Sequence, residues 1–352
     1  MPKMSKLMVL PKISVIMPVY NAEVYISQAI ESILNQSYKK FELIIVNDAS
    51  SDKSLDIING YKSKDSRIKI INLDNNQGIA IALNNGIAIA QGEYIARMDA
   101  DDISLPFRLY KQLKFMESNR ACGVCGSWVE TIDKNGNSLD VWKSPLTHES
   151  IKSELLFNSV LYHPTIMFKM EIFSSIKQIY NPDFVPAEDY ELWSRLSSIT
   201  KLANLSEVML HYRVHDKNIS HLQSDYQILK ANKVRNQLIK ELKIIPTIKQ
   251  LQLHDAISRW NKFYLLNNKN SYNNWVEQIT LANSLTNYTS EEAMQKLFID
   301  YENKLKRFDS HALAYLLDKH FKITRYTDPN KLVMIIQKLS SILPKKFIAK
   351  FL

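Results

Sequence analysis

The sequence predicts an α/β fold, in which helices flank a mostly parallel sheet, followed by a mainly α-helical C-terminal extension. Two observations favour this fold. Short apolar runs rich in β-branched residues alternate with helix-length segments in the N-terminal part, a pattern typical of βαβ units. Beyond about residue 222 the 352-residue chain is instead rich in helix formers, asparagine and bulky apolar side chains.

The elements are expected in the following order. The first strand covers residues 12–17 and its apolar run stops at Pro18, after which Asn21 is expected to cap a helix over 22–36. A second strand over 41–46 ends in a polar turn. The later elements are a strand over 67–72, a helix over 77–90, a strand beginning at Tyr94, helices over 149–157 and 190–196, and a strand ending at 211–215.

Three carboxylates, Asp99, Asp101 and Asp102, follow the strand that begins at Tyr94. Mg²⁺ and Mn²⁺ prefer oxygen ligands, and a site held by one or two carboxylates keeps positions free for phosphate oxygens of a substrate. A metal-bridged diphosphate is therefore the first hypothesis. The alternative is a solvated acidic turn, since aspartate favours turns. Asp48 follows the second strand, so it is expected at the same edge of the sheet.

Five motifs, taken together and in this order, resemble glycosyltransferase family 2. They are Pro18-Val19-Tyr20-Asn21, Asn47-Asp48-Ala49-Ser50, Asp99-Ala100-Asp101-Asp102, Glu188-Asp189-Tyr190-Glu191-Leu192-Trp193 and Tyr212-Arg213-Val214-His215. The resemblance covers about residues 10–222. It implies a GT-A, Rossmann-like catalytic domain over 1–222 and an extension over 223–352. Within the family, the chain resembles bacterial lipooligosaccharide and capsule enzymes.

The resemblance implies a nucleotide-sugar site for a UDP-sugar donor. Asp48 would accept a hydrogen bond from the uracil ring. The residues forming the base pocket would be Pro18, Val19 and Tyr20. Many relatives carry aspartate at the position of Asn47, and because asparagine lacks the charge, the nucleotide contact is assigned to Asp48.

The resemblance also implies a Mn²⁺ or Mg²⁺ cofactor. Asp101 would bind the metal ion, and Asp99 would meet the ribose or a diphosphate-linked water. His215 would complete the metal shell through a neutral imidazole, although a single histidine is as often structural. Arg213 would neutralise charge on the leaving diphosphate with its forked donors.

The adjacent carboxylates Glu188 and Asp189 are the candidates for the catalytic base. An inverting transfer needs a carboxylate that takes the proton from the acceptor hydroxyl as it attacks the anomeric carbon. Resemblance points to Asp189, with Glu188 as the competing base. The alternative is that both residues only cap the helix that begins there.

Charge and composition exclude some classes of protein. The net charge is +9, and the residues after 220 hold 21 Lys and Arg against 11 Asp and Glu. This excess lies outside the motifs and forms no recognised nucleic-acid module, so no nucleic-acid partner is expected.

Cys122 and Cys125 have the spacing of half a zinc or redox site, but the sequence has no second cysteine pair, so both are predicted to be strand residues. His163 is predicted to lie near the acceptor or to be structural.

The start of the chain is not signal-like and no apolar run is long enough to span a membrane, so a cytoplasmic location is expected. The segment over residues 331–352 mixes lysines with large apolar side chains. It is expected either to bind an anionic membrane surface on the inner face of the cell membrane or to pack on the catalytic domain.

These features together predict an inverting, metal-dependent transfer of one sugar from a UDP-sugar to a carbohydrate or glycolipid acceptor during surface-glycan assembly. Processive relatives carry a Gln-x-x-Arg-Trp element, and here Ala256 stands where glutamine is required before Arg259-Trp260. The alternatives are a polyprenyl-phosphate glycosyltransferase and a non-catalytic UDP-binding scaffold.

Overall fold

The computed structural model describes residues 11–174, 176, 178–216 and 224–321. The chain divides into two compact units, Met1–Leu238 and Ile239–Leu352. The predicted boundary between residues 222 and 223 falls outside the described residues and stays a prediction.

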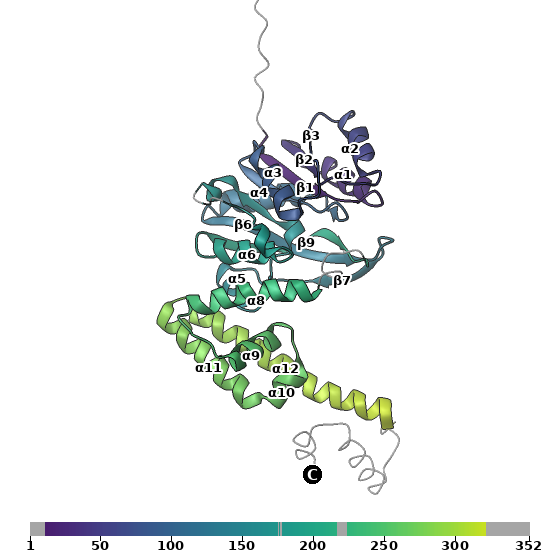
Figure 1. Cartoon of the computed structure of the whole chain (residues 1–352). Coiled ribbons are helices and arrows are strands. Elements are labelled where there is room, and N and C mark those ends of the chain that lie inside the picture. The colour runs from purple at the N-terminus through teal and green to yellow at the C-terminus, as the bar shows by residue number, and fades with distance from the viewer. Residues whose placement is uncertain (1–10, 175, 177, 217–223, 322–352) are drawn as a thin grey trace, which may run out of the picture. The chain divides into compact units, whose positions relative to one another are not determined.

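Within the described residues, nine strands form one sheet. They are β1 (Ile13–Val19), β2 (Phe41–Asn47), β3 (Ile68–Asn72), β4 (Tyr94–Arg97), β5 (Ile103–Ser104), β6 (Cys122–Ile132), β7 (Ser138–Trp142), β8 (Met167–Lys169) and β9 (Lys201–Arg213). Their order is β3-β2-β1-β4-β8-β6-β9-β5, and β7 pairs with β6 (Figure 1). Parallel pairs join β3, β2, β1 and β4 in turn, and also β6 to β9, while the other pairs are antiparallel. The predicted α/β fold is confirmed.

Helices flank this sheet, as predicted. They are α1 (Ile26–Leu34), α2 (Ser54–Lys62), α3 (Ile79–Ala88), α4 (Arg108–Ser118), α5 (His148–Leu155) and α6 (Glu188–Leu196). The prediction that Asn21 caps the first helix is wrong, because the N-cap is Tyr25. Asn21 instead has a φ of 50° and its Oδ1 accepts the Ser51 N–H at 2.8 Å, which joins the loops that follow β1 and β2.

Burial explains the continuous apolar runs of the first strands. Every residue of β2 is buried, and all but one residue of β1 are buried, as expected for parallel strands covered on both faces. Helix α1 presents one apolar face to this core, formed by Ile26, Ala29, Ile30 and Ile33. Each large apolar side chain buried in this way contributes roughly 1.5–3 kcal/mol, so packing holds the β1–α1–β2 unit that carries the first two motifs.

The turn before β4 lies directly against the backbone of β1 at Gly92. A Cβ atom on Gly92 would lie 2.5 Å from the Ser14 nitrogen and 2.7 Å from the Ile13 carbonyl carbon. The Gly92 N–H donates to Ser14 Oγ at 2.9 Å, and Ser14 Oγ donates to Glu42 Oε1 at 2.5 Å. Only glycine allows this approach, which sets the position of β4 beside β1.

The described residues from Ser224 onward, which include those of the second unit, are mainly helical, as predicted. The helices from Ser224 onward are α8 (Ser224–Glu241), α9 (Ile248–Ser258), α10 (Lys262–Asn267), α11 (Lys269–Thr286) and α12 (Glu291–Phe321). Among the described helices, none combines the length and the apolar character needed to cross a membrane. The lysine-rich segment over 331–352 lies outside the described residues, so its predicted membrane binding or packing stays a prediction.

Gly92→Ala is expected to lower the melting temperature, because its methyl group must displace the backbone of β1 and overpacking typically costs about 1–3 kcal/mol. Gly60→Ala in α2 is the matched control. A Cβ there meets nothing within 4 Å, and replacing a compatible glycine stabilises by about 0.4–1 kcal/mol. Thermal unfolding followed by circular dichroism measures both variants, and an undiminished melting temperature for Gly92→Ala would contradict the close approach.

Candidate functional site

The carboxyl ends of three strands meet at one edge of the sheet. Strands β1, β2 and β4 run parallel, so the residues that follow them lie along the same edge. Asp48 follows β2 there. The acidic cluster, defined as Asp99, Asp101 and Asp102, follows β4.

The acidic cluster is compact enough to hold a cation. One carboxylate oxygen from each of its three members lies within 4.8 Å of the others. Asp102 is buried; its Oδ1 accepts the Arg213 N–H at 2.8 Å, and its Oδ2 has no hydrogen-bond partner among the described groups. Burial, and then the charges of Asp101 and Asp99, raise the pKa of Asp102 well above its usual value. An unpartnered buried oxygen and mutual repulsion are features that a bound cation would relieve.

Arg97 is a second buried charge at the end of β4, and sequence reasoning missed it. It is 3% exposed and forms an ion pair with Asp99. Burial raises the pKa of the Asp99 carboxyl, and the Arg97 charge opposes that rise. Arg97 is the last residue of β4 and Asp99 lies in the turn that follows, so no strand or helix periodicity in the sequence relates the two side chains.

Arg213 holds the acidic cluster in place through the backbone. Its side chain is buried, and its Nε donates to the Asp101 carbonyl oxygen at 2.8 Å. One terminal nitrogen donates to Gln28 Oε1 at 2.8 Å, and the other donates to the Asp133 carbonyl at 3.2 Å. These contacts are those of a positioning residue. The predicted contact between Arg213 and a diphosphate stays a prediction.

His215 lies beside the acidic cluster, as the resemblance implied. Its Nε2 lies 3.0 Å from Asp101 Oδ2. Its ring stacks on Tyr25, with centroids 5.3 Å apart, and Tyr25 also packs against the Arg213 guanidinium at 4.5 Å. The structure therefore brings His215 and Asp101 together, while metal binding by either residue stays a prediction.

The predicted nucleotide residues have different surroundings. Asp48 is buried, and its two carboxylate oxygens accept the Gln77 N–H at 2.7 Å and the Gly78 N–H at 2.8 Å. It therefore fixes the start of α3, in addition to any role toward uracil. Tyr20 is 54% exposed and available to a base, whereas the Val19 side chain is buried. Pro18, within β1, is half-buried.

Glu188 and Asp189 occupy the first turn of α6, and their different surroundings give them different pKa values. Burial, and then the charge of Asp189, raise the pKa of Glu188 to about 8. Burial also raises the pKa of Asp189, to about 6, but hydrogen bonds from the Tyr190 N–H at 2.6 Å and from Ser159 limit the rise. The pKa of Asp189 therefore lies below that of Glu188, so Asp189 ionises more readily, while its role as the base stays a prediction.

His163 belongs to a buried polar group behind these carboxylates. Its Nε2 lies 2.8 Å from the Tyr180 hydroxyl, and its ring lies 5.8 Å from the Trp193 ring. Burial, and then the Arg97 charge, lower the pKa of His163 well below its usual value, so the ring is neutral. Asn84 of α3 accepts from the Tyr180 N–H at 3.0 Å and donates to its carbonyl at 2.8 Å. The sequence offered no signal for this arrangement of Tyr180.

Cys122 and Cys125 are buried residues of β6, as predicted. Burial raises the pKa of the Cys122 thiol to about 11 and that of Cys125 well above its usual value. Both thiols are therefore protonated at neutral pH, as expected of buried structural cysteines.

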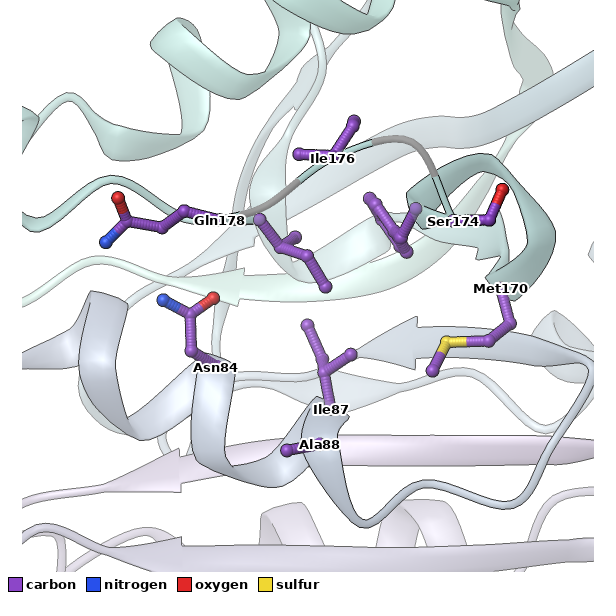
Figure 2. A pocket seen from close by; sticks show the side chains of 9 residues that line it. Asn84, Ile87, Ala88, Met170, Ser174, Ile176 and Gln178 are labelled. Carbon is purple, nitrogen blue, oxygen red and sulfur yellow. The ribbon is translucent and has the colours of Figure 1, made fainter.

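A separate pocket of about 560 Å³ lies between α3 and the segment after β8 (Figure 2). Apolar side chains such as Ile87 and Met170 line most of it, with the amides of Asn84 and Gln178 at its edge. None of the nine lining residues carries a carboxylate, and none is a predicted site residue. We therefore assign neither the donor nor the cation to this pocket.

The family follows from comparison with known proteins. A model described as Glycosyl transferase family 2 matches residues 14–176. An uncharacterized glycosyltransferase of Haemophilus influenzae is 34% identical over 260 residues, covering 69% of this chain and 80% of that protein. The chain belongs to glycosyltransferase family 2. The chain is also 38% identical over 216 residues to the Escherichia coli O-antigen biosynthesis glycosyltransferase WbnJ, covering 60% of this chain and 83% of that protein.

The GT-A fold implied by the resemblance is confirmed. The crystal structure of S. aureus TarS 1–349 in complex with UDP-GlcNAc is similar, with a TM-score of 0.57 and 19% identity. The match covers 86% of this chain and 92% of that one. The chain is therefore a family 2 glycosyltransferase with a GT-A fold, which rejects the alternative of a non-catalytic scaffold.

Glu188→Gln is expected to raise the melting temperature relative to wild type at alkaline pH, but not at about pH 5. The raised pKa means that folded Glu188 holds its proton up to about pH 8, whereas the unfolded side chain loses it near 4.5. The wild type therefore loses stability as the pH rises from about 4.5 to about 8. The glutamine variant does not lose this stability, because its side chain does not ionise. Glu117→Gln, at an exposed position of α4, is the control. An equal difference at both pH values would contradict the assigned protonation of Glu188.

Mn²⁺ with UDP is expected to raise the melting temperature of the wild type, because a ligand that binds only the folded state stabilises it. Asp101→Ala should lose most of this shift. Asp56→Ala, at an exposed position of α2, is the matched control and should keep it. Differential scanning fluorimetry measures all three proteins, and a full shift in Asp101→Ala would exclude Asp101 as a ligand.

Proposed function

We propose that the protein transfers a single sugar, with inversion and with metal dependence, from a UDP-sugar to a carbohydrate acceptor. The observation that supports this proposal is that one buried arginine, Arg97, interacts both with the acidic cluster and with Asp189. Arg97 pairs with Asp99 of the acidic cluster and also lowers the pKa of Asp189 at the start of α6. A cation site and a general base are the two groups that an inverting transfer from a nucleotide sugar requires.

The residues of the acidic cluster fit Mn²⁺ or Mg²⁺. They offer oxygen ligands only, and Asp102 Oδ2 is buried without a hydrogen-bond partner among the described groups. Asp101 is the proposed direct ligand, with His215 and Asp102 completing or supporting the site. A bound ion would offset the negative charge that develops on the departing diphosphate. The metal dependence itself is part of the proposal.

Asp189 is the proposed general base. The Tyr190 N–H donates to its Oδ1 at 2.6 Å and holds the carboxylate in place, and this carboxylate would accept the proton of the acceptor hydroxyl. The acceptor oxygen forms a bond to the anomeric carbon while the bond from that carbon to the diphosphate oxygen breaks, and UDP leaves with the bonding electrons. Attack on the side opposite the diphosphate inverts the anomeric configuration.

The donor and the pathway are inferred from similarity. TarS was solved with UDP-GlcNAc, and the name of WbnJ places that protein in O-antigen biosynthesis. We extend both to this chain as a UDP-sugar donor and a role in bacterial surface-glycan assembly. Addition of one sugar agrees with Ala256 in place of the glutamine of processive relatives, and Arg259 is ion-paired to Asp255 at 2.6 Å. A polyprenyl-phosphate acceptor remains the alternative, and a lipid-phosphate product would select it.

Asp189→Asn is expected to reduce turnover by about 10²-fold or more, the usual scale for a general base, while UDP-sugar binding is retained. Asparagine keeps the shape of the side chain but cannot take the proton. The measurement is UDP release across a panel of UDP-sugars, with donor affinity determined by calorimetry. Glu188→Gln is the matched variant and should be milder. If turnover were lost in Glu188→Gln and retained in Asp189→Asn, Glu188 rather than Asp189 would be the base.

A further inference from the structure

Three aromatic side chains meet on the β6–β7 side of the sheet, outside the residues assigned above. The Trp142 ring lies 5.7 Å from the Tyr212 ring and 6.0 Å from the Tyr162 ring, measured between centroids. Trp142 is 39% exposed, whereas Tyr162 and Tyr212 are half-buried. We call these three residues the aromatic cluster. Among these three rings, the exposed ring of Trp142 is the one that a ligand can reach.

Strand pairing explains why the rings share one face. Trp142 of β7 pairs with Val129 of β6, and Tyr212 of β9 pairs with Thr131 of β6. Val129 and Thr131 are two residues apart, so they point to the same face of the sheet, together with the residues that they pair with. All five residues of β7 are exposed, so Trp142 fills no core there.

Two residues of the aromatic cluster are close in sequence to residues that contact the acidic cluster and Asp189. Tyr212 directly precedes Arg213, which positions the acidic cluster. Tyr162 lies three residues after Ser159, whose hydroxyl hydrogen-bonds to Asp189. The two rings that Trp142 contacts therefore belong to the segments that carry Ser159 and Arg213.

The sheet order separates the aromatic cluster from the nucleotide end. Strands β1 and β2 lie on one side of β4 in the sheet, and β8, β6 and β7 lie on the other. A nucleotide held at Asp48, after β2, is therefore on the far side of β4 from Trp142. The ligand of the exposed Trp142 ring would therefore be the other substrate, the acceptor, which would approach from the side of β6 and β9.

We propose that the aromatic cluster stacks against a sugar ring of the acceptor, a proposal that rests on the transfer reaction proposed above. Pyranose rings present apolar C–H faces, and tryptophan offers a broad, rigid apolar face to pack against them. The hydroxyl edge of the stacked sugar then stays free to reach Asp189. An anionic lipid surface fits the same ring less well, because Asp140 lies exposed on the same face two residues before Trp142.

Saturation-transfer NMR on the full-length protein with UDP tests the proposal. The probes are the methyl glycosides of glucose, galactose, mannose and N-acetylglucosamine. The wild type is expected to bind at least one of them through its ring protons, and Trp142→Ala should weaken that binding about fivefold to tenfold. Trp142→Phe should keep part of it. Val141→Ala is the matched control, because Val141 is 40% exposed but points to the opposite face of β7.

Unchanged glycoside binding in Trp142→Ala, or no binding of any probe by the wild type, overturns the proposal. Trp142→Gln provides a second ringless variant and should show the same loss if the alanine variant folds poorly. The UDP dissociation constant of each variant reports whether the nucleotide end is intact. Failure of the proposed function would appear separately, as no UDP release by the wild type from any UDP-sugar.

Discussion

The repulsion among the three carboxylates of the acidic cluster is the constraint around which this part of the structure is arranged. Their oxygens lie within 4.8 Å of one another in a partly buried site, where like charges interact more strongly than in bulk water. Arg97, the last residue of β4, offsets part of the repulsion by pairing with Asp99. Arg213, the last residue of β9, binds the Asp101 carbonyl and the Asp102 carboxylate. Contacts from the ends of β4 and β9 therefore hold the cluster in place.

The same buried guanidinium connects the cluster to the base. Arg97 lowers the pKa of both Glu188 and Asp189, although burial raises both pKa values overall. Arg97 ends β4, which lies between β1 and β8 in the sheet, and its charge acts both on the acidic cluster and on the first turn of α6. Loss of Arg97 would leave Asp99 unpaired and remove a favourable charge near Asp189, so one substitution would disturb both functional groups.

The sequence alone predicted the elements whose signals are local. The alternation of apolar runs located β1 to β4, and the acidic cluster was visible because its members are neighbours in sequence. Contacts between distant segments could not be predicted. Arg213 reaches Gln28 across 185 positions, and no local pattern relates them. The expected cap at Asn21 failed for the same reason, because its side chain binds Ser51 of another loop rather than the helix that follows.

The choice between Glu188 and Asp189 shows what structure adds to a motif. Both residues are acidic, adjacent and placed at a helix start, where the backbone favours anions, so the sequence cannot rank them. In the fold, Asp189 receives hydrogen bonds from the Tyr190 N–H and from Ser159, which stabilise its charged form. Glu188 Oε2 is buried with no hydrogen-bond partner among the described groups, and the Asp189 charge lies beside it. Asp189 therefore ionises more readily than Glu188, and an ionised carboxylate is the form able to accept a proton.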